Sequence, residues 1–564
     1  MRPLSDRILA KVATIHAQRQ YRSFMRAAAQ AVETQDRVLR ANIKRHDESE
    51  FGRNHRFDQI NSYREFVDRV PIQSFEDIRP YVQKVMDGNT RAMFGRGEQV
   101  LMFAMTSGST DKPKYVPVTK AFLKEYRRGW NAFGIKALLD HSDAFLRPIL
   151  QVVSPMDERR THFGIPCGSI SGLLAANQKR IVRRYYVTSP STAYVPDCES
   201  RYYTIMRFAV PRDVSWMVTA SPATQLKLAR VAETHAERLI RDIRDGTLTP
   251  PGEMPDAVRC ALMPNVFPQP DLARRLDAMI SERGALLPRD YWRLSFLANW
   301  TGGSMGLHLQ DFAHYFGDIP VRDIGLLATE GRVSIPLRDG TPNGVLDVGG
   351  SFFEFVEAGA NGDDAGAVKR CHELEVGREY RVIMTTAAGF YRYDIGDYVR
   401  VHGFEGRAPI VEFLHRGENV ASITGEKLTE WQVTTAFDRC CRALSLPNRC
   451  FVLSPSWGDP PFYRMYVEQN ESTDDGWVEA FDRELSTINL EYASKRGSAR
   501  LGSVQVSTIP TGALEKLNEN RRRVREAGNE QFKHRYLCAH PGEDAELAAL
   551  VSDQPASDTL PTPS

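Results

Sequence analysis

Apolar residues recur at helical spacing through the first part of the chain. Over residues 5–54, apolar side chains such as Ile8 and Val12 lie three or four positions apart among charged ones, which predicts helices with one buried face. We expect these helices to pack on the outside of the main domain. The same kind of pattern predicts further helices at residues 62–70, 77–87 and 120–143.

Short apolar runs alternate with helical stretches in the middle of the chain, which is the rhythm of an α/β sheet. The run at residues 147–154 predicts a buried strand, and residues 222–245 predict a helix. Further strands are predicted at residues 213–219, 291–300 and 324–329. After residue 349 the runs become shorter and closer together, which predicts a β-rich subdomain with strands at residues 351–356, 381–386, 390–393, 398–402 and 409–414.

A polar, glycine-containing break at residues 415–420 separates this region from a new pattern, and we place a domain boundary there. Beyond the break, two helical patterns alternate with strand-like runs, which predicts a small α+β domain. The last residues are acidic and then rich in Pro, Ser and Thr, so we expect them to be disordered. The predicted organisation is an N-terminal α/β domain (1–415), whose sheets are flanked by helices and joined to the β-rich subdomain, a C-terminal α+β domain (416–541) and a tail (542–564).

Length and composition indicate the class of protein and its cellular compartment. A chain of 564 residues exceeds what one hydrophobic core usually organises. Because 73 basic side chains nearly balance 71 acidic ones, there is no electrostatic case for nucleic acid or an anionic membrane as a partner. No apolar stretch is long enough for a signal peptide or a bilayer span, so we expect a cytoplasmic protein. We also expect a monomer. The eight cysteines form no Cys-x-x-Cys pair and are expected to be buried thiols.

One loop between two strand-like runs carries the clearest chemical signal. Its small and hydroxylated residues let several backbone N–H groups and hydroxyls face one anion, and its lysines add positive charge, so it has the parts of a polyphosphate cradle. It is not a Walker A loop, because the Gly-x4-Gly-Lys-Ser/Thr spacing is absent. The residues alone leave an ordinary hairpin turn as the alternative. The candidate binding residues are Thr106, Ser107, Gly108, Ser109, Thr110, Lys112 and Lys114.

Three further segments carry candidate chemistry. The glycines of Thr301-Gly302-Gly303 follow a predicted strand and let a flat ring lie against the backbone, although a plain strand-to-helix turn explains them equally well. Glu330 follows the predicted strand 324–329 and suits Mg²⁺, which takes one or two protein carboxylates and leaves its other positions to phosphate and water. Asp397 suits a ribose diol, or else it fixes a turn as Asp394 does.

The order of these segments resembles the motif order of the adenylate-forming superfamily, although Asp111 stands where the superfamily loop commonly has Gly. More narrowly, the chain resembles the Gretchen Hagen 3 family, the acyl acid–amido synthetases of plants and bacteria. The likeness rests on the helical N-terminus and on four motifs along the chain. They are Thr301-Gly302-Gly303-Ser304-Met305, Tyr391-Arg392-Tyr393-Asp394-Ile395-Gly396-Asp397, Glu491-Tyr492-Ala493-Ser494-Lys495-Arg496 followed by Arg500-Leu501-Gly502, and Gln531-Phe532-Lys533-His534-Arg535.

The resemblance implies an ATP-dependent, AMP-forming ligase. A carboxylic acid attacks the α-phosphorus of ATP and expels pyrophosphate, and an amino acid then attacks the acyl-adenylate to form an amide and release AMP. The expected partners are thus two small molecules, an acid and an amino acid. The resemblance also implies that the loop and Thr301, Gly302, Gly303 and Thr329 bind ATP, that Asp397 and Arg416 hold the ribose, and that Glu330 holds Mg²⁺.

The resemblance further implies that the C-terminal domain is mobile and brings a lysine to the α-phosphate. Lys533 matches the family motif and is preferred, while Lys516 matches the wider superfamily. Two other functions stay open: an acyl-CoA synthetase that uses the same first step with a thiol as the second nucleophile, and a nucleotide-binding protein without turnover.

Overall fold

The helices at the start of the chain pack through apolar faces, and the third, fourth and fifth of them each begin after a serine. They are α1 (Leu4–Ala29), α2 (Ala31–His46), α3 (Glu50–Asn54), α4 (Tyr63–Arg69) and α5 (Phe75–Met86). Gln35 of α2 is buried, and its side-chain amide donates to the backbone oxygens of Val348 (2.6 Å) and Ser351 (2.7 Å) and accepts from the Phe353 N–H (2.8 Å). This one side chain therefore attaches α2 to the backbone where strand β13 (Phe352–Glu357) begins.

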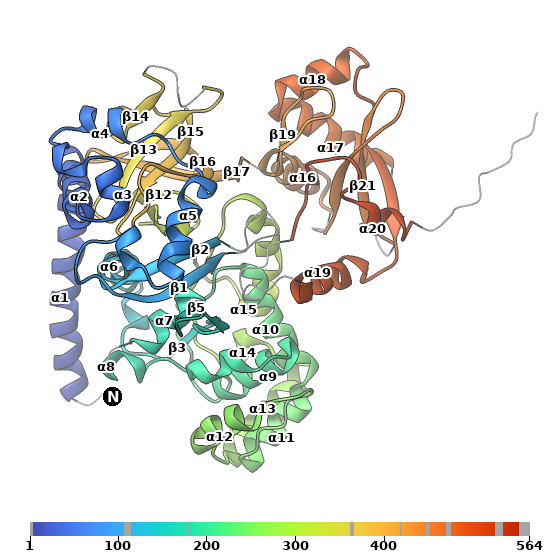
Figure 1. Cartoon of the computed structure of the whole chain (residues 1–564). Helices are drawn as coiled ribbons and strands as arrows, with labels where there is room; N and C mark the ends of the chain where they lie inside the picture. The colour runs from blue at the N-terminus through green and yellow to red at the C-terminus, as the bar shows by residue number, and fades with distance from the viewer. Residues whose placement is uncertain are drawn as a thin grey trace, which may run out of the picture. The chain divides into compact units, whose positions relative to one another are not determined.

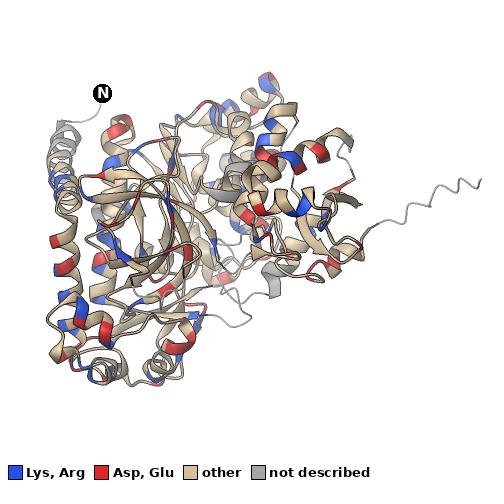
Figure 2. Cartoon of the chain, turned by 90° about the horizontal axis from the view of Figure 1, so that it is seen from above, with Lys and Arg blue, Asp and Glu red and all other residues tan. Residues whose placement is uncertain are grey.

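The chain divides into two units in this computed structural model, which describes residues 4–106, 114–178, 180–360, 366–417, 420–446, 450–469, 475–524 and 534–551 (Figure 1). The first unit ends at Leu414 and the second begins at His415. The predicted domain boundary, between residues 415 and 416, lies beside this division. No described helix is both long enough and apolar enough to cross a bilayer. Basic and acidic residues are interspersed along the same helices (Figure 2).

A four-stranded parallel sheet with apolar side chains on both faces lies in the middle of the first unit. Its order is β3 (Ile149–Gln151), β6 (Trp216–Val218), β7 (Phe296–Asn299) and β8 (Val321–Asp323). Because side chains alternate along a strand, Trp216 and Val218 pack into one hydrophobic core and Met217 packs into a second core with helices α9 (Cys198–Ala209) and α10 (Pro222–Thr234). Strand β3 is teal and helices α9 and α10 are green in Figure 1.

A β-hairpin flanks the predicted phosphate loop. Strand β1 (Val100–Thr106) pairs antiparallel with β2 (Lys114–Thr119), so that Thr106 faces Lys114, and pairs in parallel with β5 (Pro166–Gly168). Helix α6 (Lys120–Asp140) starts directly after β2, where the Thr119 hydroxyl accepts from the Phe122 N–H (3.2 Å). The strands on either side of the loop are therefore described, whereas residues 107–113 are not.

The β-rich subdomain is a seven-stranded sheet that includes β13 (Phe352–Glu357), β15 (Glu379–Thr385), β16 (Tyr393–Glu405) and β17 (Ala408–Arg416). The prediction of separate strands at 390–393 and 398–402 is wrong, because β16 continues through Gly396. That glycine has φ +73°, and the pairing with β15 shifts register nearby, so the glycine belongs to a bulge and does not end the strand.

The predicted strand at 324–329 is also wrong in its extent. Only Leu327–Ala328 form a strand, β9, which pairs with β10 (Gly331–Arg332) in a short hairpin. Gly325 has φ +86°, and a Cβ at this position would lie 2.3 Å from the Ser334 backbone oxygen. The chain therefore turns sharply at Gly325, before the hairpin, and Glu330 lies at the hairpin turn.

The second unit is an α+β fold whose three strands are ordered β20 (Val452–Ser456), β21 (Phe462–Glu468) and β22 (Gln505–Ile509). Its helices include α16 (Glu430–Leu444), α17 (Asp475–Ile488), α18 (Leu490–Gly497) and α19 (Ala513–Val524). The disordered tail predicted from Gly542 is wrong in its first part, since α20 (Ala545–Ala548) follows. Leu547 is buried there, and the Tyr466 hydroxyl donates to Asp544 (2.6 Å), so these residues complete the fold.

Candidate active site

Thr301 is held in place by a buried carboxylate at the end of the parallel sheet. It follows β7, and both its backbone N–H (2.6 Å) and its hydroxyl (2.8 Å) donate to Oδ2 of Asp323, the last residue of β8. Oδ1 of Asp323 accepts from the Gly325 N–H (2.6 Å). One carboxylate thus fixes the two chain segments that leave β7 and β8, at the edge of an α/β sheet where ligands bind.

Asp323 is a residue that the sequence reasoning missed. Burial raises the pKa of Asp323 to about 6, while the hydrogen bonds from Thr301 and Gly325 oppose this shift. The sequence signal available for it is a carboxylate at the end of a predicted strand and just before a glycine. Gly302 also needs to be small, since a Cβ there would lie 3.1 Å from the Pro342 Cβ.

Glu330, the predicted metal ligand, occupies the turn of the β9–β10 hairpin and is 4% exposed. Among the described residues, no hydrogen-bond or ion-pair partner approaches its carboxylate. Since no described donor occupies this carboxylate, it is available to a cation, and Glu330 fits the role of a metal ligand. Gly331, beside it, packs against Ser351 and Met384, since a Cβ there would meet the Met384 Cε at 2.8 Å.

The start of β16 connects the candidate segments. The Gln73 N–H donates to the Arg392 backbone oxygen, and the Asp394 N–H donates to the Gln73 oxygen, both at 2.9 Å. Two residues after Gln73, the Phe75 ring lies 5.6 Å from Nζ of Lys114, the lysine that ends the predicted loop. On the other side, Met384 pairs with Tyr393 in the sheet and contacts the glycine after Glu330. Contacts from the start of β16 therefore lead to Lys114 on one side and to the hairpin that carries Glu330 on the other.

Asp397, the predicted ribose ligand, is 8% exposed and lies on β16 just past the bulge. Asp394 of the same motif fixes the bulge, since its Oδ1 accepts from the Gly396 N–H (2.8 Å); whether Asp397 binds a ribose or fixes a turn stays a prediction. Asp394 also forms an ion pair with Arg381 (3.3 Å). The two carboxylates thus have different surroundings, although one motif contains both.

The first residues of the same motif hold the fold together. The Tyr391 hydroxyl donates to the Asn42 backbone oxygen (2.8 Å), so the Nδ1 of His46, 2.8 Å away, donates to that hydroxyl. Burial lowers the pKa of His46 to about 3, which keeps the imidazole neutral. Arg392 is buried with φ +45°, and its Nε lies 3.0 Å from Oε2 of the buried Glu354. These contacts attach the N-terminal helices to β16.

Helix α6 presents Trp130 and Phe133 to a buried arginine. The Arg332 guanidinium lies 4.8 Å from the Trp130 ring centroid and 5.4 Å from that of Phe133. Its side chain passes so close to Gly129 that a Cβ there would lie 2.5 Å from its Cδ. Burial lowers the pKa of Arg332 to about 10, so the guanidinium keeps its charge near neutral pH.

Several predicted residues cannot be placed in the site. Ser107, Gly108, Ser109, Thr110, Lys112 and Lys533 lie outside the described residues, and the side chain of Thr106 and the burial of Gly303 are not described either. Thr329 is partly exposed, between β9 and Glu330. Arg416 is the last residue of β17, and Lys516 is exposed on α19; both belong to the second unit. The roles of these residues stay predictions.

Comparison with family models matches nearly the whole chain, in three consecutive parts. Residues 20–321 match the GH3 family N-terminal domain, residues 344–416 the GH3 family central domain, and residues 431–541 the GH3 family C-terminal domain.

Similarity to individual proteins extends over most of the chain. The jasmonoyl–L-amino acid synthetase JAR6 of Nicotiana attenuata is 25% identical over 488 residues, which cover 80% of this chain and 82% of that protein. The indole-3-acetic acid-amido synthetase GH3.10 of Arabidopsis thaliana is 23% identical over 493 residues, covering 80% and 82%. Among solved structures, the AtGH3.15 acyl acid amido synthetase in complex with 2,4-DB superposes with a TM-score of 0.80 at 20% identity, covering 96% of each chain.

Proposed function

The chain belongs to the GH3 family, and from this premise we propose that it is an acyl acid–amido synthetase. It joins a carboxylic acid to an amino acid through an amide bond, with ATP as the energy source and with AMP and pyrophosphate as products. The observation that carries the proposal is the match to all three domains of the family, in order, between residues 20 and 541.

In the first step, a carboxylate oxygen of the acid attacks the α-phosphorus of ATP, and the bond from that phosphorus to the bridging oxygen of the leaving pyrophosphate breaks. This chemistry depends on positioning and on neutralising charge more than on covalent help. Thr301, fixed by Asp323, supports the adenosine end of ATP. Residues 106–114, which end at Lys114, take the leaving pyrophosphate, and Asp397 holds the ribose.

Glu330 would hold magnesium, since Mg²⁺ takes one or two protein carboxylates. The support for this assignment is its position at the hairpin turn and a carboxylate that lacks a hydrogen-bond or ion-pair partner among the described residues. Bound Mg²⁺ would neutralise negative charge on the phosphate oxygens. On the protein's side, the short hairpin from β9 to β10 fixes the position of the carboxylate.

In the second step, the amine of the amino acid attacks the acyl carbon of the adenylate. The new carbon–nitrogen bond forms, the carbon–oxygen bond to AMP breaks, and the nitrogen loses a proton. We assign Lys533, or else Lys516, to the α-phosphate in the first step. Removing the responsible lysine should slow adenylation while ATP binding stays nearly unchanged; if neither Lys533→Ala nor Lys516→Ala slows pyrophosphate release, this assignment is wrong.

The deciding experiment is ATP–pyrophosphate exchange with the full chain and a panel of carboxylic acids. Exchange that depends on an added acid supports the adenylation step, and its absence with every acid would overturn the proposal in favour of a nucleotide-binding protein without turnover. Amino acids and coenzyme A are then offered in parallel, and the product mass is measured. Formation of an amide supports the synthetase, whereas formation of a thioester would assign an acyl-CoA synthetase.

A further inference from the structure

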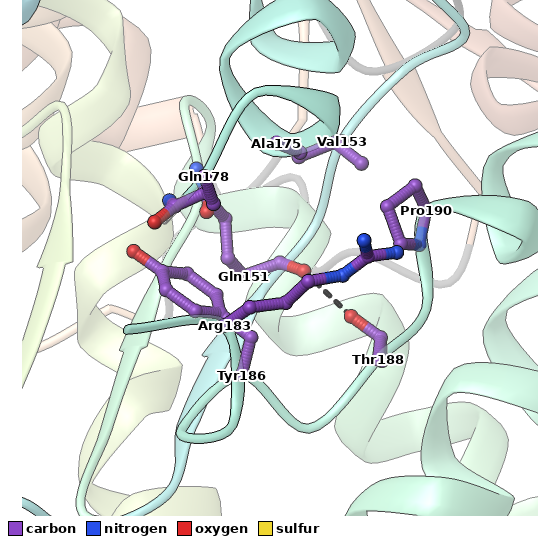
Figure 3. A pocket seen from close by; sticks show the side chains of 8 residues that line it. All are labelled: Gln151, Val153, Ala175, Gln178, Arg183, Tyr186, Thr188 and Pro190. Atoms are coloured by element: carbon purple, nitrogen blue, oxygen red, sulfur yellow. Dashed lines mark hydrogen bonds between the residues drawn. The ribbon is translucent and has the colours of Figure 1, made fainter. Parts of the chain in front are cut away.

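Two hollows in the described part of the chain differ greatly in size. The one beside β3, whose lining residues are shown in Figure 3, encloses about 20 Å³, enough for a single water molecule. The other lies beside β22 in the second unit and encloses about 720 Å³, which is within the usual range of binding sites. This second hollow, here called the β22 groove, therefore has room for a segment of chain.

The β22 groove lies between helix α17 and strand β22, on one face of the sheet. Val478 and Arg483 line it from the helix, and Val504 and Val506 line it from the strand side. Ile509 points to the opposite face, where it packs with Leu514 and Leu547. Because side chains alternate along a strand, Thr508 faces the groove as Val506 does.

The outer edge of β22 is free among the described residues. β22 is the last strand of its sheet and pairs with β21 alone. The Gln469 N–H donates to the Ile509 oxygen (2.9 Å), so the backbone groups of Ile509 face β21, and those of Val506 and Thr508 face away from it. No described group forms a hydrogen bond with these outward N–H groups. An edge of this kind, without charged residues or proline, is a template for another strand.

Arg483 gives the groove a positive charge that no described carboxylate neutralises. The residue is exposed, and no described acidic group, that of Glu479 one turn earlier included, lies within 4.0 Å of its guanidinium. Arg496 of the same groove, by contrast, forms an ion pair with Asp482 (2.7 Å). The groove therefore suits an extended segment that brings an apolar side chain to the valines and a carboxylate to Arg483.

The chain returns to the end of β22 after helix α20. Val551 packs against a small apolar cluster that contains Ile509, the last residue of β22. Residues 552–555 can then span about 13 Å when extended, whereas neighbouring strands are only about 4.8 Å apart. A segment that turns back here would run antiparallel to β22, and residues 556–560 would match that strand in length.

The prolines after Val551 are placed as such a strand requires. Pro555, Pro561 and Pro563 are separated by even numbers of positions, so in an extended chain they all lie along the same edge. Proline has no N–H and is tolerated in an edge strand where this position faces solvent. The other edge then carries the N–H groups of Ala556, Asp558 and Leu560, whose side chains share one face.

We propose that residues 556–560 pair antiparallel with the free edge of β22, as a fourth strand of this three-stranded sheet. Hydrogen-bonded partners in antiparallel strands carry their side chains on the same face. Asp558 and Leu560 therefore enter the β22 groove, the carboxylate toward Arg483 and the apolar side chain toward the valines. The segment covers an edge that another chain could otherwise use. This pairing departs from the disorder that composition predicts for these residues, and it is independent of the catalytic activity.

The test is amide hydrogen exchange at single-residue resolution, in the full chain and in a chain that ends at Val551. The N–H groups of Val506 and Thr508 should exchange at least about tenfold more slowly in the full chain, because the added strand accepts their hydrogen bonds. The N–H of Ser507 faces β21 and is the internal control, so its exchange rate should differ much less between the two chains.

Two substitutions in the full chain test which edge of the segment faces β22. Ala556→Pro removes an N–H that points to β22 and should raise the exchange rates of Val506 and Thr508 several-fold. Ser557→Pro, the matched control, removes an N–H from the outer edge and should leave these rates unchanged.

Equal exchange of Val506 and Thr508 in the full and the shortened chain, whether fast or slow, would overturn the proposal. Protection that rises with protein concentration would overturn it as well, since the edge would then pair with a second copy of the chain. Equal effects of Ala556→Pro and Ser557→Pro would also refute it, because only a paired strand distinguishes its two edges.

Discussion

Replacing Arg392 by methionine should destabilise the first unit by about 3–5 kcal/mol, the usual result of removing one partner from a buried ion pair. The side chains of Arg392 and Glu354 are 4% and 1% exposed, and the Arg392 Nε lies 3.1 and 3.0 Å from the two Glu354 oxygens. Without the guanidinium, Glu354 keeps only the hydrogen bond from the Tyr63 hydroxyl (2.9 Å). The Val70 backbone oxygen also loses its bond from Arg392.

A second, more exposed ion pair, between Arg400 and Glu379, provides the control. Arg400 of β16 lies 2.6 Å from Glu379, and their side chains are 27% and 36% exposed. Solvent screens this pair, so Arg400→Met should cost no more than about 1 kcal/mol. The comparison holds the type of substitution constant, so the difference between the two variants reports chiefly on burial.

The assay is a double-mutant cycle for each pair, with the free energy of unfolding of the full chain measured in urea at fixed pH and salt. We expect a coupling energy of at least about 2 kcal/mol between Arg392 and Glu354 and less than about 1 kcal/mol between Arg400 and Glu379. Similar coupling energies for the two pairs would refute the reasoning. Burial raises the pKa of Glu354 against the opposing effect of Arg392, so Arg392→Met should raise it further. That variant should accordingly regain stability as the pH is lowered.

The remaining predictions concern the site and the end of the chain. Burial raises the Asp323 pKa to about 6, so the folded state holds this proton longer than the unfolded state, and stability should fall by about 3 kcal/mol as the pH rises from about 4 to 7. Asp323→Asn should remove this pH dependence and, because its amide NH₂ cannot accept from Thr301, should raise KM for ATP. Glu330→Gln should lower the rate of adenylation at least tenfold and weaken its dependence on magnesium concentration, while the midpoint of thermal unfolding changes little. A chain that ends at residue 540 should unfold at lower urea concentration than one that ends at residue 551, because only the longer chain keeps Leu547 in the core; equal midpoints would contradict this.

Local pattern was sufficient to predict most elements, because burial imposes a period of 3.6 or 2 on the sequence. The alternation at residues 213–219 lies around β6, and the helical pattern after Thr429 corresponds to α16. The errors occurred where one glycine decides the course of the chain. Gly396 has a positive φ within a continuing strand, whereas Gly325 has a positive φ where the predicted strand is interrupted. Sequence spacing alone does not distinguish these two uses.

The candidate site was predicted less completely than the fold, because its supporting contacts join residues far apart in sequence. Asp323 acts through Thr301, which is 22 positions earlier in the chain. Arg392 was predicted only as part of a motif, yet its partner Glu354 lies on another strand of the sheet. Side chains whose function depends on such distant partners have no local signature, whereas Glu330 and Asp397 could be chosen from chemistry and position.

The Tyr391–Asp397 segment has a practical consequence for redesign. Its first residues anchor helices near the N-terminus, and its last residue is a candidate ligand of the nucleotide. A library that randomises this segment would mix variants that lose activity because they misfold with variants that lose activity because they no longer bind ATP.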